Sequence, residues 1–167
     1  MYMEFLFIVC NYFIIQKKKI LLFELGIPFI TGVVCLILSF GFGIDSQYGI
    51  IEKSFGYVGT LLGFTLAALT LLLSSEKIKE TREYQLETVL YNRKATLYDL
   101  ILTSYTYLIV VESILCISFF IVQLFDFVYI RSVAVIFNTL YIFLLFNVLL
   151  ATIRTVTDMY FILIKRE

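Results

Sequence analysis

The sequence contains no histidine, one proline, three cysteines and few charged residues. Without histidine, the chain lacks the commonest general base and the commonest metal ligand. The cysteines, Cys10, Cys35 and Cys116, each lie in an apolar run and form no C-x-x-C pair. This spacing argues against a disulfide framework and against a zinc site, and we expect no metal and no cofactor. The formal net charge is 0, which gives no reason to expect contact with nucleic acid.

The apolar content defines the class of protein. Hydrophobic residues make up 61% of the 167 residues, and charged residues only 16%. Soluble domains have about 45–50% apolar and about 25% charged residues. We therefore expect residues 1–167 to form a single membrane domain in the lipid bilayer of the plasma or inner membrane.

Four long apolar runs predict helices that cross the membrane, at residues 20–43, 54–75, 97–125 and 132–153. A helix needs about 20 apolar residues to cross a bilayer core of about 30 Å, and a helix satisfies its own backbone hydrogen bonds in lipid. The expected fold is an all-α integral membrane four-helix bundle. Pro28 is expected to kink the first span or to mark a local break.

The first 19 residues precede these spans and end in three lysines. The apolar part, residues 1–16, is short for a span, and positive charges after an apolar run are the wrong order for a secretory signal. Three interpretations are open: a helix in the membrane interface, a short extra span, or a poorly ordered extension. We favour the interfacial segment.

The segment from Glu76 to Lys94 differs sharply from its neighbours, because charges crowd it and apolar residues are sparse. No proline or glycine interrupts residues 66–94. The pattern predicts that the second span continues into water as a cytoplasmic helical segment over residues 76–96. This segment is the expected contact for a cytosolic protein partner or for another copy of the chain.

Basic residues predict the orientation. They gather at residues 17–19, 77–94 and 154–166, whereas the two opposite loops contain only Lys53 and Arg131. The positive-inside rule places both termini and residues 76–96 in the cytoplasm.

The second span carries a face of small residues, Gly56, Gly59, Gly63 and Ala67, at intervals of three or four positions. Small residues at this spacing let a second helix approach closely in a membrane. The pattern predicts a helix-packing face, and with it a homo-oligomer.

Glu112 is the only acidic residue deep in a predicted span. Because a charge there is costly, its side chain is expected to face the bundle interior, a partner or water. Asn138 and Thr65 are expected at similar depth and are its candidate partners. Two interpretations are open: an ion- or proton-responsive site, including a pore-lining ring in an oligomer, and a structural hydrogen bond between helices.

Other polar residues of the fourth span have a simpler interpretation. Asn147 and Arg154 share a helix face near the cytoplasm, and with Asp158 they are expected to bond the ends of neighbouring helices. The sequence shows no glycine-rich phosphate loop, nucleophile elbow or HExxH motif. We therefore expect a protein that is not an enzyme.

The whole chain resembles, in its layout, the small four-span membrane components of bacterial antiviral defence systems, such as the membrane subunit of the Kiwa system. The features that carry this resemblance are the four short-looped spans and the run GFTLAALT at residues 63–70, which leads into the charged segment. The resemblance implies an oligomeric membrane sensor, or a pore-forming, permeabilising effector, that acts with a cytosolic partner. The alternatives are a small proton-coupled transporter that uses Glu112, and a passive membrane anchor or assembly subunit.

Overall fold

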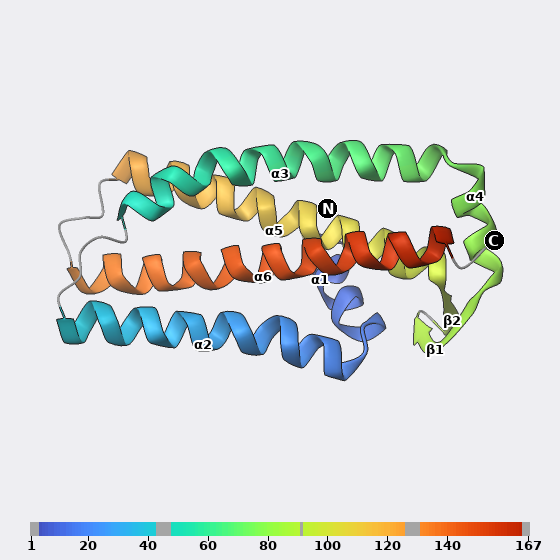
Figure 1. The fold of residues 1–167 in the computed structure, drawn as a ribbon, viewed down its shortest axis with the longest axis horizontal. Helices are drawn as coiled ribbons and strands as arrows, with labels where there is room; N and C mark the ends of the chain where they lie inside the picture. The colour runs from blue at the N-terminus through green and yellow to red at the C-terminus, as the bar shows by residue number, and fades with distance from the viewer. Residues whose placement is uncertain (1–3, 43–47, 91, 126–130, 165–167) are drawn as a thin grey trace.

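The computed structural model describes residues 4–42, 48–90, 92–125 and 131–164. Its four long helices are α2 (Lys18–Phe42), α3 (Tyr48–Ser74), α5 (Leu97–Phe125) and α6 (Arg131–Ile164) (Figure 1). Each is long and apolar enough to cross a membrane, over Lys18–Gly41, Lys53–Ser74, Leu97–Val122 and Val133–Phe161. The prediction of an all-α fold with four such helices is confirmed. α6 continues to Ile164, through a region that the sequence did not assign to the last helix.

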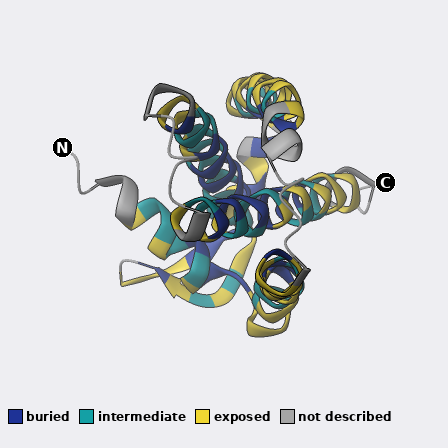
Figure 2. Ribbon diagram, turned by 90° about the vertical axis from the view of Figure 1, so that its left-hand side faces the viewer, coloured by how far each residue is buried: buried dark blue, intermediate teal, exposed yellow. Residues whose placement is uncertain are grey.

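The four long helices pack as an open row in the order α3, α5, α6, α2 (Figure 1). α5 and α6 form the middle of the row. In the most apolar 18-residue stretch of each helix, 39% and 33% of the residues are buried. In the corresponding stretches of the end helices α2 and α3, only 17% and 11% of the residues are buried. Buried residues accordingly lie between the helices, while the outer surfaces of the row are exposed (Figure 2). The largest buried cluster gathers side chains of α5 and α6, including Leu108, Val111, Leu115 and Val148, around Val58 of α3.

The N-terminal helix α1 (Glu4–Ile15) lies across the long helices instead of alongside them (Figures 1 and 2). At 12 residues it is too short to cross a bilayer. It packs against α5 and β1, with Tyr12 and Ile15 buried. The segment predicted to be interfacial is therefore helical over Glu4–Ile15 and is packed against the hairpin end of its own bundle.

The predicted helical segment over residues 76–96 is wrong in its second half. α3 ends at Ser74, and Ser75 takes an extended conformation. A short helix α4 (Glu76–Lys79) and a 3-10 turn η1 (Glu80–Glu83) follow, and then an antiparallel hairpin of β1 (Gln85–Leu90) and β2 (Arg93–Thr96). Side chains of β1 alternate between outward and inward positions. Asn92 has a φ of 62°, a left-handed conformation that asparagine adopts more readily than most residues.

A capping box fixes the junction between β2 and α5. Thr96 Oγ1 accepts a hydrogen bond from the backbone N–H of Asp99 at 3.2 Å, and Asp99 Oδ2 accepts one from the backbone N–H of Thr96 at 2.9 Å. This reciprocal pair satisfies two backbone donors at the start of the helix. It sets where α5 begins and where the hairpin lies relative to that helix.

Candidate functional site

Glu112 lies on the buried face of α5, together with Leu108, Val111 and Leu115, at the three- and four-residue intervals of one helix face. Its side chain is 0% exposed. Glu112 Oε1 lies 3.2 Å from Thr65 Oγ1 of α3, and Glu112 Oε2 has no hydrogen-bond partner. The structure therefore brings together two of the three residues predicted for an intramembrane polar site.

The hydroxyl of Thr65 has one proton and two candidate acceptors. Its Oγ1 lies 2.8 Å from the carbonyl oxygen of Leu61, one turn back in α3, and 3.2 Å from Glu112 Oε1. The shorter contact to Leu61 leaves Thr65 able to accept a hydrogen bond from Glu112. A protonated carboxyl group can donate that bond, whereas a carboxylate can only accept. No cationic side chain within the described ranges forms an ion pair with Glu112. The geometry suits a protonated Glu112.

The third predicted member, Asn138, is not part of this site. Its side chain is buried on α6, but it forms no hydrogen bond to Glu112 or Thr65 in the part of the chain that the structure describes. Asn138 and Glu112 have similar expected depths, but the rotation of α6 about its own axis decides which side chains meet. Because Glu112 faces α3 inside one protomer, a pore lined by a ring of this residue does not fit the geometry.

A second polar cluster, which the sequence did not predict as a unit, joins α1, α2 and α6. Arg154 Nε lies 2.7 Å from Glu24 Oε1, so the two side chains form an ion pair. The direction of the N–H group does not meet the geometry of a hydrogen bond between these two atoms. Arg154 Nη2 donates to the hydroxyl oxygen of Tyr12 at 2.9 Å, and the Tyr12 hydroxyl donates to Glu24 Oε2 at 2.6 Å. The three side chains form a closed, largely buried triangle.

The cluster extends to α5 through Tyr107. The Tyr107 ring stacks on the Tyr12 ring with centroids 3.8 Å apart, and its hydroxyl donates to Asn147 Oδ1 at 2.6 Å. Asn147 Nδ2 donates in turn to the backbone carbonyl of Glu24 at 3.1 Å. Asn147 and Arg154 thus bond neighbouring helices as predicted, but Asp158 forms no ion pair with Arg154 among the described residues.

The Asn147 contact explains how α2 tolerates Pro28. A helical carbonyl accepts from the N–H four residues later, and proline has no N–H. Pro28 therefore leaves the carbonyl of Glu24 without its helical donor, and the amide of Asn147 replaces that donor. α2 runs through Pro28 as one helix, so the predicted local break does not occur.

The small-residue face of α3 is not covered by another helix of the same chain. Gly56, Gly59, Gly63 and Ala67 are all exposed, and a Cβ atom added at any of the three glycines would meet nothing within 4 Å. Leu72, near the end of the same helix, is by contrast buried in a cluster with Ile78 and Ile101. Among the six glycines whose surroundings the structure describes, Gly32 of α2 is the one that lies against another helix, beside Thr139 of α6.

No protein-family profile, curated protein or solved structure matches this chain. Across residues 4–42, 48–90, 92–125 and 131–164, no group of three or more acidic, cysteine or histidine side chains is placed to hold a metal ion. The class of protein that the fold defines is a helical protein with four helices able to cross a membrane.

Proposed function

We propose that this protein is an oligomeric multi-pass membrane protein, without enzymatic activity, that senses a change in the membrane and acts with a cytosolic partner. The proposed location is the plasma or inner membrane, with both termini in the cytoplasm. Following the resemblance in layout, the proposed setting is bacterial antiviral defence. In that setting the protein either signals to its partner or permeabilises the membrane itself.

One observation supports the proposal of an oligomer: no further helix covers either end of the row of the four long helices in the described structure. α2 and α3 are only 17% and 11% buried over their apolar windows. The outward face of α3 carries the small residues Gly59, Gly63 and Ala67, all of them exposed. A Cβ atom added at either glycine would meet nothing within 4 Å. A helix of a second copy can approach such a face closely and gain van der Waals contact that lipid tails supply less well.

The buried Glu112 supports a sensing role. Carboxyl groups at this depth are costly unless they are neutral or paired, and they mark functional positions in many membrane proteins. A change in its protonation would place an uncompensated charge between α3 and α5, because Thr65 is its only polar contact in the described structure. We propose that this change shifts the packing of α3, the helix that leads directly to α4 and the hairpin.

The hairpin end is the proposed contact for the cytosolic partner. It lies at the end of the molecule where α4, β1, β2 and the last turns of α6 come together (Figure 1). Tyr84 and Val89 expose 56% and 59% of their surface there. Exposed aromatic and β-branched side chains among charges are suited to a protein contact.

Disulfide cross-linking in native membranes tests the oligomer. In a variant with Cys10, Cys35 and Cys116 changed to serine, Gly59→Cys should yield cross-linked homo-oligomers under oxidation. Phe64→Cys is the matched control, because Phe64 is exposed on α3 about a quarter turn from the small face. Equal cross-linking at both positions, or none at Gly59, would contradict the proposed interface. Co-purification of another chain, lost when the hairpin is replaced by a short linker, would identify the partner.

A proton-coupled transporter is the second candidate. The observation that favours it is the unpaired Oε2 of the buried Glu112, a carboxyl group that can release and take up a proton. Liposomes containing only this protein distinguish the candidates. A proton-coupled transporter moves protons and substrate across the membrane even when no other protein is present. A sensor is silent in that assay and responds only when its partner is present. A passive anchor is silent in both.

A further inference from the structure

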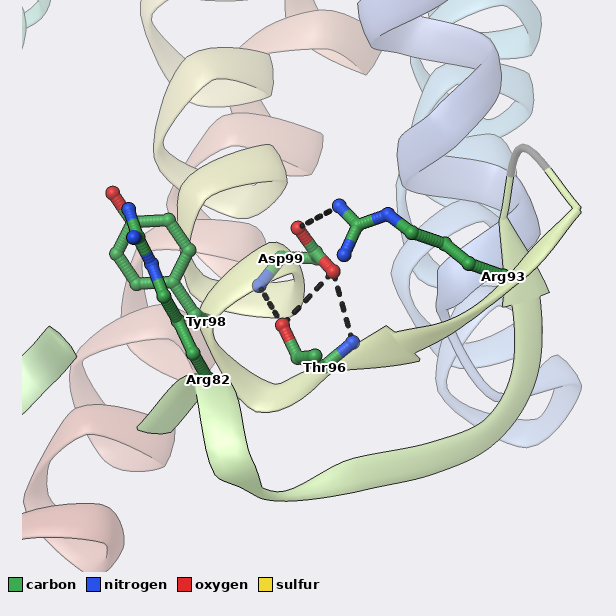
Figure 3. A pocket seen from close by; sticks show the side chains of 5 residues that line it. All are labelled: Arg82, Arg93, Thr96, Tyr98 and Asp99. Atoms are coloured by element: carbon green, nitrogen blue, oxygen red, sulfur yellow. Dashed lines mark hydrogen bonds and ion pairs between the residues drawn. The ribbon is translucent and has the colours of Figure 1, made fainter. Parts of the chain in front are cut away.

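A small open pocket lies at the hairpin end, where η1 and β2 meet the first turn of α5. Its volume is about 310 Å³, and it is lined by Arg82, Arg93, Thr96, Tyr98 and Asp99 (Figure 3). The two arginines come from different elements and lie on either side of Thr96 and Asp99 (Figure 3). The pocket is thus lined by side chains of three elements, η1, β2 and the start of α5.

Arg82 is held in place without using its hydrogen-bond donors. Its guanidinium carbon lies 4.5 Å from the centroid of the Tyr98 ring. Stacking occupies one face of the guanidinium group and leaves the N–H groups at its edge available. Within the described structure, Arg82 donates no hydrogen bond and forms no ion pair. Stacking on Tyr98 therefore orients the guanidinium group of Arg82, and its N–H groups remain able to bind a ligand.

Arg93 retains donors beyond its ion pair. Arg93 Nη2 contacts Asp99 Oδ1 at 3.0 Å, and the Arg93 side chain is 60% exposed. The other oxygen of Asp99 accepts from the backbone N–H and the hydroxyl of Thr96, both at 2.9 Å. Asp99 is therefore committed to the helix cap, while the remaining N–H groups of Arg93 face solvent in the pocket.

We propose that this pocket binds a phosphate monoester, held between the guanidinium groups of Arg82 and Arg93. Guanidinium groups match the oxygens of phosphate in charge and geometry better than lysine does. Two arginines against one aspartate leave the lining with one net positive charge. A volume of about 310 Å³ admits a phosphate group with a few further atoms, at the lower end of ligand pockets.

The position of the pocket gives the phosphate two possible sources. Tyr98 and Asp99 are among the first residues of the candidate span Leu97–Val122, which places the pocket at the level of lipid headgroups. Basic residues assign this end to the cytoplasm. The ligand is therefore a phosphate monoester headgroup of the inner leaflet or a soluble phosphate ester such as a nucleotide. The pocket does not depend on the proposed oligomer, because all five lining residues belong to one protomer, whereas the inner-leaflet source rests on the orientation given in the proposed function.

Calorimetric titration of the full chain in phosphatidylcholine nanodiscs tests the proposal. The probes are short-chain phosphatidic acid, AMP and inorganic phosphate. Binding of phosphatidic acid alone indicates a lipid source, and binding of AMP or inorganic phosphate indicates a soluble source; either result supports the site. Arg82→Gln and Arg93→Gln should each weaken binding by about tenfold or more, the loss expected for a charge-assisted hydrogen bond.

Three further variants make the test specific. Lys94→Gln removes the same charge next to Arg93 on the opposite face of β2, and it should leave binding unchanged. Arg82→Lys keeps the charge but loses the planar stack on Tyr98, and it should weaken binding. Asp99→Asn can still cap the helix but removes the nearby negative charge, so it should tighten binding. Absence of binding to all three probes overturns the proposal, as does an equal loss in Lys94→Gln or weaker binding in Asp99→Asn. A thermal unfolding midpoint like that of the unchanged protein confirms that each variant is folded.

Discussion

Asn147 of α6 supplies the hydrogen bond that Pro28 removes from α2. Its Nδ2 atom donates to the backbone carbonyl of Glu24 at 3.1 Å, the carbonyl to which residue 28 would otherwise donate. An interruption in one helix is thus repaired by a side chain of its neighbour. The same amide accepts the hydroxyl of Tyr107 at 2.6 Å, so one residue fixes three helices together.

The relationship between Pro28 and Asn147 predicts non-additive stabilities. Asn147→Leu should lower the free energy of unfolding by about 1–3 kcal/mol, because it leaves a buried carbonyl without a donor. In a Pro28→Ala background the helix N–H is restored, and the same substitution should cost about 1 kcal/mol less. The measurement is reversible denaturation in detergent micelles for the four proteins of the cycle. Equal costs in both backgrounds would show that Asn147 does not repair the helix.

The buried triangle of Glu24, Arg154 and Tyr12 should respond asymmetrically to substitution. Arg154→Leu should lower the free energy of unfolding by about 3–5 kcal/mol, because it leaves Glu24 buried without its counter-ion. Adding Glu24→Leu removes that charge as well, and the double variant should be more stable than Arg154→Leu alone. Tyr12→Phe keeps the ring stack and loses only the hydroxyl bonds, for about 1–3 kcal/mol. A double variant less stable than either single variant would rule out a dominant ion pair.

Glu112 is expected to matter more for response than for stability. Its Oε2 atom is already unpaired, and the Thr65 hydroxyl retains the carbonyl of Leu61 as an acceptor. Glu112→Leu should therefore leave the free energy of unfolding unchanged within about 1 kcal/mol, or raise it. Glu112→Gln copies the shape of the protonated acid but cannot titrate. Both variants should lose the pH-dependent depolarisation of cells that express the protein with its partner. Depolarisation by Glu112→Gln with the pH dependence of the unchanged protein would remove the proton-responsive role.

Two glycines should behave in opposite ways. An added Cβ at Gly32 would lie 3.6 Å from Thr139 Cγ2 and 3.8 Å from Phe143 Cβ, which is ordinary contact, so Gly32→Ala should be tolerated. Gly32→Leu should separate α2 from α6 and cost about 1–3 kcal/mol through overpacking. A Cβ atom added at Gly63 would meet nothing within 4 Å, so Gly63→Leu should leave protomer unfolding unchanged and reduce the cross-linked oligomer. Gly41→Leu, also unobstructed, is the control that should affect neither. Destabilisation of the protomer by Gly63→Leu would contradict the exposed position of that face.

The orientation can be tested by labelling single cysteines in a background without the three native ones. Gln85 is exposed at the start of β1, and a cysteine there should react only from the cytoplasm. Ser46 lies outside the described residues, in the loop predicted on the opposite side, and a cysteine there should react with an impermeant reagent added to intact cells. Labelling of both positions from outside would contradict the four-span orientation.

Composition and apolar run length determined the class of this protein. The length of hydrocarbon that a helix must cross is fixed by the bilayer, so the four long helices could be located from hydropathy alone. The cost of a charge in lipid left three environments open for Glu112, and its burial against Thr65 is one of them. By contrast, the sequence predicted a helix where β1 and β2 form, because without glycine or proline only Asn92 marked the turn.

The tertiary structure alone decided which polar residues meet. Glu112 and Asn138 have similar expected depths, but helix rotation directs Glu112 to Thr65 and leaves Asn138 elsewhere. Glu24, Tyr12 and Arg154 are distant in the sequence, and only the placement of α1 across the bundle brings them together. The order of the helices likewise depends on which helix surfaces pack against each other. This packing leaves the small-residue face of α3 on the outside of the bundle. Periodicity identifies a face of a helix, but it does not specify what lies opposite that face, because the partner is chosen by contacts between segments far apart in the chain.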